Sequence, residues 1–145
     1  MKQVVIDASI VMKSILPNDK QEKCKALIAR FNELQPVAPA LWMYEITSAF
    51  TKSIHFGMLT PDEGRAGLAQ AMSLGVELAA PDERQTELAL NWTLKLKRAS
   101  AYDSFYLALS ETLDAEFWTA DERLYNALKD ARLPWLHWLD EIQIG

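Results

Sequence analysis

Three aspartates stand at positions where a carboxylate can do chemistry. Asp7 follows the β-branched run 4–6, Asp121 comes just after the apolar segment 116–119, and Asp103 lies near the expected start of a helix. The first two therefore follow expected strands. Ligands of open parallel sheets bind outside the carboxyl ends of the strands, where these two side chains would lie.

Each aspartate also has a purely structural explanation. An acid in the first turn of a helix accepts backbone hydrogen bonds and favours the helix dipole. Asp7 can cap the helix that follows it, and the segments Ser100–Asp103 and Thr119–Glu122 both match the capping-box pattern. Glu122 is explained by that box and would point about 100° away from Asp121 on a helix. For each aspartate taken singly, both interpretations stay open.

Glu45 is harder to explain as a structural residue. It lies in the middle of the expected helix 41–55, on or beside its apolar stripe. Its neighbours three and four positions away include no Lys or Arg; they are Leu41, Trp42, Ser48 and Ala49. Because Glu is almost never fully buried without a partner, we expect either a partner from elsewhere in the fold or a place at a cleft.

If the four acids converge, they need a cation or a proton. Two carboxylates about 5 Å apart repel each other by about 3 kcal/mol at an effective dielectric of about 20. Oxygen ligands alone favour Mg²⁺ or Mn²⁺. The only cysteine, Cys24, and two distant histidines are too few to supply the ligands of a structural zinc site. Convergence is an expectation at this stage, because spacing in the sequence does not establish it.

Short apolar strands alternate with helices along the chain. The expected strands are residues 4–6, 36–39, 76–78, 116–119 and 135–139, and the expected helices are residues 20–31, 41–55, 60–75, 81–97, 100–113 and 121–131, with an apolar-rich segment at 10–16. This alternation predicts an α/β fold with a largely parallel sheet. No linker or repeat interrupts the pattern, so we expect residues 1–145 to form a single domain.

Composition narrows the class of protein. A chain of 145 residues with 50% hydrophobic composition is long and apolar enough to build a core, which excludes a disordered protein or a disulfide scaffold. The net charge of −5 excludes a wholly basic nucleic-acid coat. Neither a signal peptide nor a membrane span is expected, so the predicted location is the cytoplasm.

Four segments together resemble the PIN domain, and most closely the VapC-like toxins of prokaryotic toxin–antitoxin pairs. The segments contain Val4 to Ile10, Glu45 to Phe50, Tyr102 to Ser110 and Thr119 to Leu124. They occur in order with compatible spacing, and the resemblance extends from Val4 to about Trp138.

The resemblance implies both a fold and an activity. The fold would be PIN-like, a three-layer α/β/α arrangement around a parallel sheet of about five strands. The activity would be that of a metal-dependent endoribonuclease that hydrolyses RNA phosphodiester bonds, as the toxin of a type II toxin–antitoxin system. The implied partners are RNA, a small antitoxin protein and a second copy of the chain in a homodimer.

The resemblance also assigns residues. Asp7, Glu45, Asp103 and Asp121 match the acidic quartet of the family and would hold one or two Mg²⁺ or Mn²⁺ ions. Asp7 and Asp103 are expected as direct ligands, and Glu45 as a ligand or as the acceptor of a proton from water. Asp121 would act through a second ion or through bound water.

Other residues are candidates for contact with the substrate. By resemblance, Ser9 and Thr119 match hydroxyl positions beside the first and last acids. Lys13, Lys97 and Arg98 are cations near the acids in sequence, and an acidic site needs such cations to admit an anionic strand. The alternative for Lys97 and Arg98 is a solvated helix end, whose cations favour the dipole.

Two rival functions remain at this stage. A PIN-like module could bind nucleic acid or protein without cleaving it, although an idle acidic quartet would keep costly like charges together. The chain could also be a phosphotransfer receiver or an aspartyl phosphatase. Ser9 stands where such a phosphatase usually has a second aspartate, and no acceptor aspartate follows a middle strand.

Overall fold

The computed structural model describes residues 1–98 and 100–143. In this part of the chain, five strands form one parallel sheet: β1 (Lys2–Ile6), β2 (Leu34–Pro39), β3 (Glu77–Ala79), β4 (Glu116–Thr119) and β5 (Leu136–Trp138). Their order across the sheet is β3-β2-β1-β4-β5, and each neighbouring pair is parallel. The predicted α/β fold with a parallel sheet of about five strands is therefore confirmed.

Seven α-helices occur in the described residues: α1 (Ala8–Ile15), α2 (Gln21–Ile28), α3 (Leu41–His55), α4 (Pro61–Met72), α5 (Glu83–Lys95), α6 (Tyr102–Leu113) and α7 (Glu122–Leu128). Short 3₁₀ turns follow α2, α7 and β5, at Ala29–Asn32, Lys129–Ala131 and Leu139–Glu141. The helices expected over 20–31 and 121–131 thus each end in a tighter turn. Among the described residues, no helix combines the length and the apolar character needed to cross a membrane.

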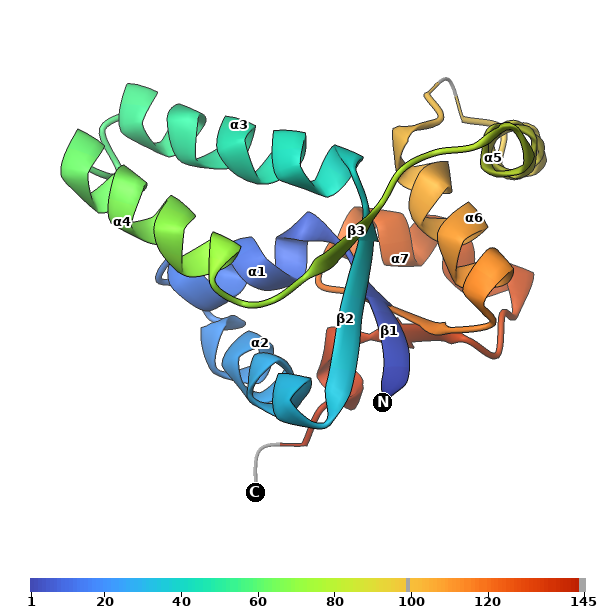
Figure 1. The fold of residues 1–145 in the computed structure, drawn as a ribbon, viewed down its shortest axis with the longest axis horizontal. Helices are drawn as coiled ribbons and strands as arrows, with labels where there is room; N and C mark the ends of the chain where they lie inside the picture. The colour runs from blue at the N-terminus through green and yellow to red at the C-terminus, as the bar shows by residue number, and fades with distance from the viewer. Residues whose placement is uncertain (99, 144–145) are drawn as a thin grey trace.

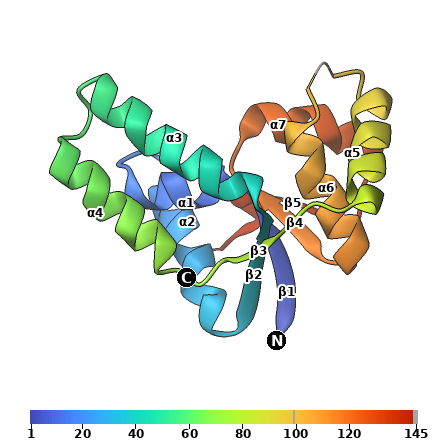
Figure 2. The same cartoon turned by 45° about the horizontal axis from the view of Figure 1, so that its top comes forward.

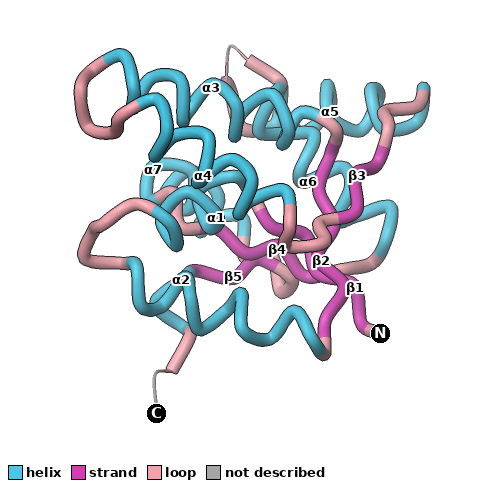
Figure 3. Tube along the Cα trace, turned by 60° about the vertical axis from the view of Figure 1, so that its left-hand side comes forward, coloured by secondary structure: helices cyan, strands magenta, loops and turns pink. Residues whose placement is uncertain are grey.

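Helices cover both faces of the sheet. The helix α6 packs against β1, β2 and β4, and α5 packs on α6. On the other side α1 packs against α2 and α3, and α3 packs against α4. Figure 1 shows α1 to α4 (blue to green) on one side of the strands and α5 and α6 (yellow to orange) on the other, and Figure 2 shows the same division from a second angle. In Figure 3 the strands form one band between the helices.

The strand β1 occupies the middle of the sheet. Its residues Val4, Val5 and Ile6 are at most 1% exposed, as the β-branched run predicts for a strand covered on both faces. From β1 the chain runs outward through β2 to β3, and it then returns to the other side of β1 to form β4 and β5. The order therefore reverses between β1 and β4, which is the place where open α/β sheets form their binding crevice.

Two prolines lie in β2, which is an inner strand. Proline has no N–H to donate and is normally confined to strand edges. Here β3 pairs with β2 only from Val37 onward, so Pro36 precedes that ladder. The pairing with β1 ends at Val37, so Pro39 lies beyond it. Each proline thus stands where one ladder is absent, which explains how an inner strand tolerates both.

The hairpin of α3 and α4 is closely packed. Gly57 adopts φ +76° after α3 and ends that helix as its position predicts. Thr60 and Glu63 form a capping box at the start of α4. A Cβ atom added to Gly67 would lie 2.4 Å from Cε1 of Phe50 on α3, so the two helices approach closely at this glycine. This contact joins α4 to the helix that carries Glu45.

Candidate active site

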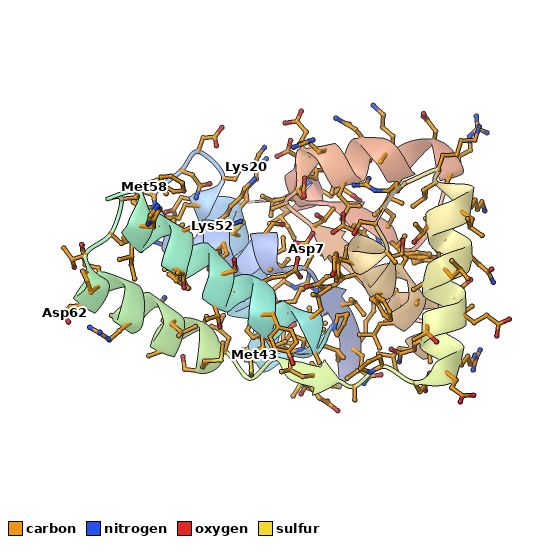
Figure 4. The ribbon with its side chains drawn as sticks, turned by 90° about the horizontal axis from the view of Figure 1, so that it is seen from above. Asp7, Lys20, Met43, Lys52, Met58 and Asp62 are labelled. Carbon is orange, nitrogen blue, oxygen red and sulfur yellow. The ribbon has the colours of Figure 1, made fainter. Side chains whose placement is uncertain are left out.

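The carboxyl ends of the strands carry the acids singled out in the sequence. Asp7 follows β1 and Asp121 follows β4, on the two sides of the reversal in strand order. Figure 4 looks onto this edge, with Asp7 labelled between α3 and the C-terminal helices. Glu45 on α3 and Asp103 at the start of α6 line the same cavity. Four acids from four separate segments therefore meet at one place.

The side chain of Asp7 is held by two hydroxyl groups. Asp7 caps α1, and its Oδ1 accepts hydrogen bonds from the backbone N–H and the hydroxyl of Ser9. Its Oδ2 accepts from the hydroxyl of Thr119, the last residue of β4. The same two hydroxyls accept from the backbone N–H groups of Ala120 (3.1 Å) and Asp121 (3.0 Å). The ends of β1 and β4 are thus joined through Ser9 and Thr119.

Glu45 receives its partner from a distant part of the chain, as the sequence led us to expect. The hydroxyl of Tyr106, on α6, donates to Oε1 of Glu45 over 2.6 Å. Tyr106 is 1% exposed, so its ring is fixed in the core against Phe117 while its hydroxyl reaches the cavity. Glu45 is half-buried, and this hydrogen bond orients its carboxylate.

Asp103 is placed by α6, but without the capping box expected at Ser100. The helix begins at Tyr102 with Ala101 as its N-cap, and no side chain caps it. Asp103 is therefore a first-turn acid that is not engaged by Ser100. Instead its Oδ2 lies 3.3 Å from Nη2 of Arg98. This ion pair joins the segment after α5 to the acidic cavity.

The second expected capping box, at Thr119 and Glu122, is also absent, because the N-cap of α7 lies two residues after Thr119. Asp121 is the N-cap, and its Oδ1 accepts from the N–H groups of Arg123 (3.0 Å) and Leu124 (3.2 Å). The hydroxyl of Thr119 is thereby left for Asp7 and the backbone of Asp121. Capping and a place in the acidic cavity are therefore combined in Asp121.

The acids share a cavity of about 230 Å³. Besides the four carboxylates its walls are Ala8, Ser9, Met12, Ala49 and Tyr106. Burial is the main cause of raised pKa values: it raises the pKa of Asp7 to about 7, although hydrogen bonds from Ser9 and Thr119 act in the opposite direction. Burial also raises the pKa of Glu45 and of Asp103, and the charge of Asp121 adds to the rise in all three groups.

These properties fit a hard divalent cation by the chemistry of the donors. The cavity offers carboxylate and hydroxyl oxygens, and the described residues of its walls include no histidine or cysteine. A cation would favour the ionised carboxylates, against the burial and the smaller repulsion that raise the three pKa values. In residues 1–98 and 100–143 no three His, Cys, Asp or Glu side chains are already gathered closely enough to hold a metal between them. Mg²⁺ commonly binds through one or two carboxylates and keeps its waters.

The cations expected near the substrate lie in different surroundings. Nζ of Lys13 donates to the carbonyl of Ala120 over 2.8 Å, so this ammonium lies beside the backbone that leads to Asp121. Arg98 is paired with Asp103. Lys97 is exposed, with φ +55°, and is not among the residues that line the cavity. Thr119 is fully buried, which leaves its hydroxyl only an indirect effect on a substrate, through Asp7 and Asp121.

Two residues of this region were missed in the sequence. Tyr106 stands in the apolar pattern of α6 and looks like an ordinary core residue, although its spacing of three from Asp103 places both on one face. Lys52 lies on α3 two helical turns after Glu45 and lines a neighbouring hollow together with Tyr44, Glu45 and Ser48. Its i+7 spacing from Glu45 is the signal that would have found it.

Solved structures share the fold at low sequence identity. The PAE2754 protein of Pyrobaculum aerophilum matches with a TM-score of 0.69 and 17% identity, over 97% of this chain and 92% of that one. A toxin–antitoxin complex from Klebsiella pneumoniae gives 0.64 and 14%, over 92% and 95%. VapBC-1 from nontypeable Haemophilus influenzae gives 0.60 and 15%, over 94% and 96%.

Sequence comparison identifies the family. No curated protein matches the chain. The sequence model of the PIN domain family, however, matches residues 4–129. This span contains Asp7, Glu45, Asp103 and Asp121. The predicted resemblance is thus confirmed at the level of the family: this chain belongs to the PIN domain family.

Proposed function

We propose that this protein is a metal-dependent endoribonuclease that hydrolyses RNA phosphodiester bonds and serves as the toxin of a type II toxin–antitoxin pair. The observation that carries the proposal is the meeting of Asp7, Glu45, Asp103 and Asp121 in one cavity, with three of their pKa values raised. The carboxylates of this cavity repel one another, which costs stability, and a bound cation would offset that repulsion. Membership of the PIN domain family, whose members are generally nucleases, supports the same function.

The four carboxylates would hold Mg²⁺ or Mn²⁺. When bound, such an ion polarises the scissile phosphate and lowers the pKa of an attacking water. Asp7 is oriented by Ser9 and Thr119, which keep both of its oxygens fixed at the end of β1. Asp103 lies beside Arg98, whose positive charge favours the ionised form of this carboxylate.

Glu45 is suited to accept a proton from the attacking water. Its raised pKa makes it a stronger base than an exposed glutamate, and general bases act best when their pKa lies near the working pH. Tyr106 fixes Oε1 of Glu45 by a hydrogen bond from a rigid ring. Asp121 contributes negative charge beside the other three acids while it caps α7.

The partners proposed are an RNA substrate, a small antitoxin protein and a second copy of this chain. Two of the structural neighbours are toxin–antitoxin assemblies by name, which supports an antitoxin partner here. The cytoplasmic location expected from the sequence fits an enzyme that acts on cellular RNA.

The decisive experiment is cleavage of a pool of structured and unstructured RNAs by the purified protein, in Mg²⁺, in Mn²⁺ and in EDTA. The test variant is Asp103→Asn. The matched control is Asp82→Asn, because Asp82 caps α5, asparagine also caps helices, and Asp82 does not line the acidic cavity. We expect metal-dependent cleavage by the wild type and by Asp82→Asn, and a loss of at least about 100-fold in Asp103→Asn.

Equal cleavage by Asp103→Asn would assign the activity to a contaminant. Binding of RNA without cleavage under any metal condition would favour the rival function, a PIN-like module that binds nucleic acid without cutting it. The toxin role has its own readout, because expression of the wild type in a bacterial host should stop growth and expression of Asp103→Asn should not.

A further inference from the structure

An apolar hollow of about 300 Å³ opens beside the acidic cavity, where the N-terminal ends of α3 and α6 approach each other. We call it the aromatic hollow and define it by Leu41, Tyr44, Pro81, Tyr102 and Phe105. Three of these five side chains are aromatic, and the described lining contains no charged group. Its size lies at the lower end of the range for small-ligand sites, about 300–1,000 Å³, so it suits a single ring system better than a peptide helix.

The aromatic hollow and the acidic cavity are lined by residues of the same two helices, α3 and α6. Tyr44 precedes Glu45 in α3, and Tyr102 precedes Asp103 in α6, so each tyrosine stands next to a cavity acid. Tyr44 and Glu45 also line a further hollow of about 400 Å³ with Lys52. The surface of α3 therefore carries, in sequence, an aromatic site, a carboxylate and a cation.

The side chains of Tyr44 and Tyr102 are mostly exposed to solvent, so packing in the core does not account for aromatic residues at these positions. Tyr44 is 72% exposed and Tyr102 is 67% exposed, whereas Tyr106, one turn after Tyr102, is 1% exposed. Phe105 is half-buried between these extremes. Rings that stand open beside a charged site are the usual platforms on which proteins stack the bases of single-stranded nucleic acid.

We propose that the aromatic hollow is a nucleobase subsite, which takes one unpaired base of the RNA next to the phosphate that is cleaved. The inference rests on the proposed ribonuclease function and names the form of its substrate. Ring faces of Tyr44 and Tyr102 supply stacking, which tolerates different bases because every base has a π-face. A paired base is held in its own helix, so the subsite selects RNA that is single-stranded at the cleaved position. Lys52, on the other side of Glu45, is placed to contact a further phosphate.

The test uses short unstructured RNAs that differ at one nucleotide beside the cleaved bond, which carries either a normal base or no base at all. We expect the wild type to cleave the abasic RNA with kcat/KM lower by about 5- to 150-fold, the range for one stacked base. Tyr102→Phe keeps the ring and should keep this penalty. Tyr102→Ala removes one of the two rings and should reduce the penalty, and Tyr102→Ala together with Tyr44→Ala should cleave both RNAs equally. An undiminished penalty in Tyr102→Ala together with Tyr44→Ala would overturn the proposal.

A binding measurement separates failure of the subsite from failure of the proposed function. Asp121→Asn, whose changed residue does not line the aromatic hollow, is mixed with RNA that carries the fluorescent base 2-aminopurine at the same position. Stacking should quench the fluorescence of the 2-aminopurine. A second substitution in the same chain, Tyr102→Ala, should restore the fluorescence, whereas Tyr102→Phe should leave it quenched. Quenching that depends on the ring, in a protein whose wild type cleaves nothing, would retain the subsite and reject the nuclease. Absence of such quenching would reject the subsite even if the wild type cleaves RNA.

A second copy of the chain is the other occupant to test. Sedimentation of the wild type and of Tyr102→Ala at the same concentrations measures whether the chain self-associates through this surface. An assembly that Tyr102→Ala dissociates would make the aromatic hollow a protein interface and overturn the nucleobase assignment. Equal sedimentation, with equal melting temperatures to show that both proteins are folded, supports it.

Discussion

At the scale of the residue, Asp7 combines burial with a nearly complete set of hydrogen bonds. Ser9 and Thr119 donate to its two oxygens, which favours the ionised form, yet burial is the larger effect and raises the pKa to about 7. An unfolded aspartate titrates near pH 3.9. The folded state without metal therefore holds the Asp7 proton over a range of pH in which the unfolded chain has lost it.

The first prediction concerns stability against pH in EDTA. Because the folded pKa is raised, the contribution of Asp7 is fully present below about pH 4 and is lost as the pH rises through about 7. We expect the unfolding free energy of the wild type to fall relative to Asp7→Asn between pH 5 and 8, by up to a few kcal/mol. Asparagine can still cap α1. Urea unfolding of both proteins at several pH values measures the difference, and parallel curves would contradict the assignment.

The second prediction concerns Tyr106, which has the sequence pattern of an ordinary core aromatic. Its hydroxyl lowers the pKa of Glu45 by donating to it, against the larger effect of burial. Tyr106→Phe should therefore raise the pKa of Glu45 further, move the acidic limb of the rate profile to higher pH, and lower kcat because Glu45 loses its orientation. Stability should fall by only about 1–2 kcal/mol.

The control for that prediction is Tyr125→Phe. The ring of Tyr125 stacks on Trp138 at 5.2 Å and does not line the acidic cavity. A pH–rate profile of Tyr106→Phe that coincides with those of Tyr125→Phe and the wild type would show that Glu45 does not depend on Tyr106.

At the scale of the element, α3 carries Glu45 to the cavity, and α4 sets the position of α3. The approach depends on the absence of a side chain at Gly67, which lies against the ring of Phe50. Alanine has the higher helix propensity, by about 1 kcal/mol, but a rigid ring beside the added Cβ leaves little room for it. The packing term and the propensity term therefore oppose each other at this position.

The third prediction is that packing prevails at Gly67 and matters less at Gly64. We expect Gly67→Ala to destabilise the protein by about 1–3 kcal/mol, because Phe50 must move. At Gly64 the added Cβ meets the flexible end of Ile54, 2.4 Å from Cδ1, so Gly64→Ala should cost less. Thermal unfolding of both variants tests the order. The reverse order would mean that α3 moves as a unit and that Phe50 does not fix its position.

The same scale shows what could be predicted from the sequence. Alternating apolar strands and helices identify the fold, because their periods differ and a parallel sheet needs helical crossovers. The strand order is not visible, since it depends on contacts between distant segments such as β1 and β4. The capping boxes predicted at Ser100 and at Thr119 were wrong. At Thr119 the hydroxyl donates to Asp7, which is distant in sequence, instead of capping the nearest helix. Lys52 was missed because its i+7 spacing from Glu45 has to be combined with the position of the cleft, which the sequence does not give, before it distinguishes Lys52 from other exposed lysines.

At the scale of the whole molecule, charge and stability are linked through the acidic cavity. The chain carries a net charge of −5, and four carboxylates meet in one cavity of about 230 Å³. Asp121 raises the pKa of Asp7, Glu45 and Asp103 alike. The metal-free protein is therefore expected to be less stable than its core alone would make it.

The fourth prediction is that Asp121→Asn stabilises the metal-free protein while it lowers activity. The change removes one like charge, and asparagine retains an oxygen to cap α7. We expect a higher melting temperature than the wild type in EDTA at pH 8, and a smaller rise on addition of Mg²⁺. Asp82→Asn serves again as the control away from the cavity. A lower melting temperature in EDTA would show that capping by Asp121 outweighs the repulsion.

The single cysteine gives this protein an internal reporter of opening. Cys24 is fully buried on α2, and burial raises its pKa to about 12. Thiol reagents attack the thiolate, so labelling requires a transient opening that exposes α2. The rate of alkylation therefore measures how often this side of the molecule opens, without an engineered probe. Compared with and without Mg²⁺ or RNA, that rate would tell whether events at the strand ends are felt in α2.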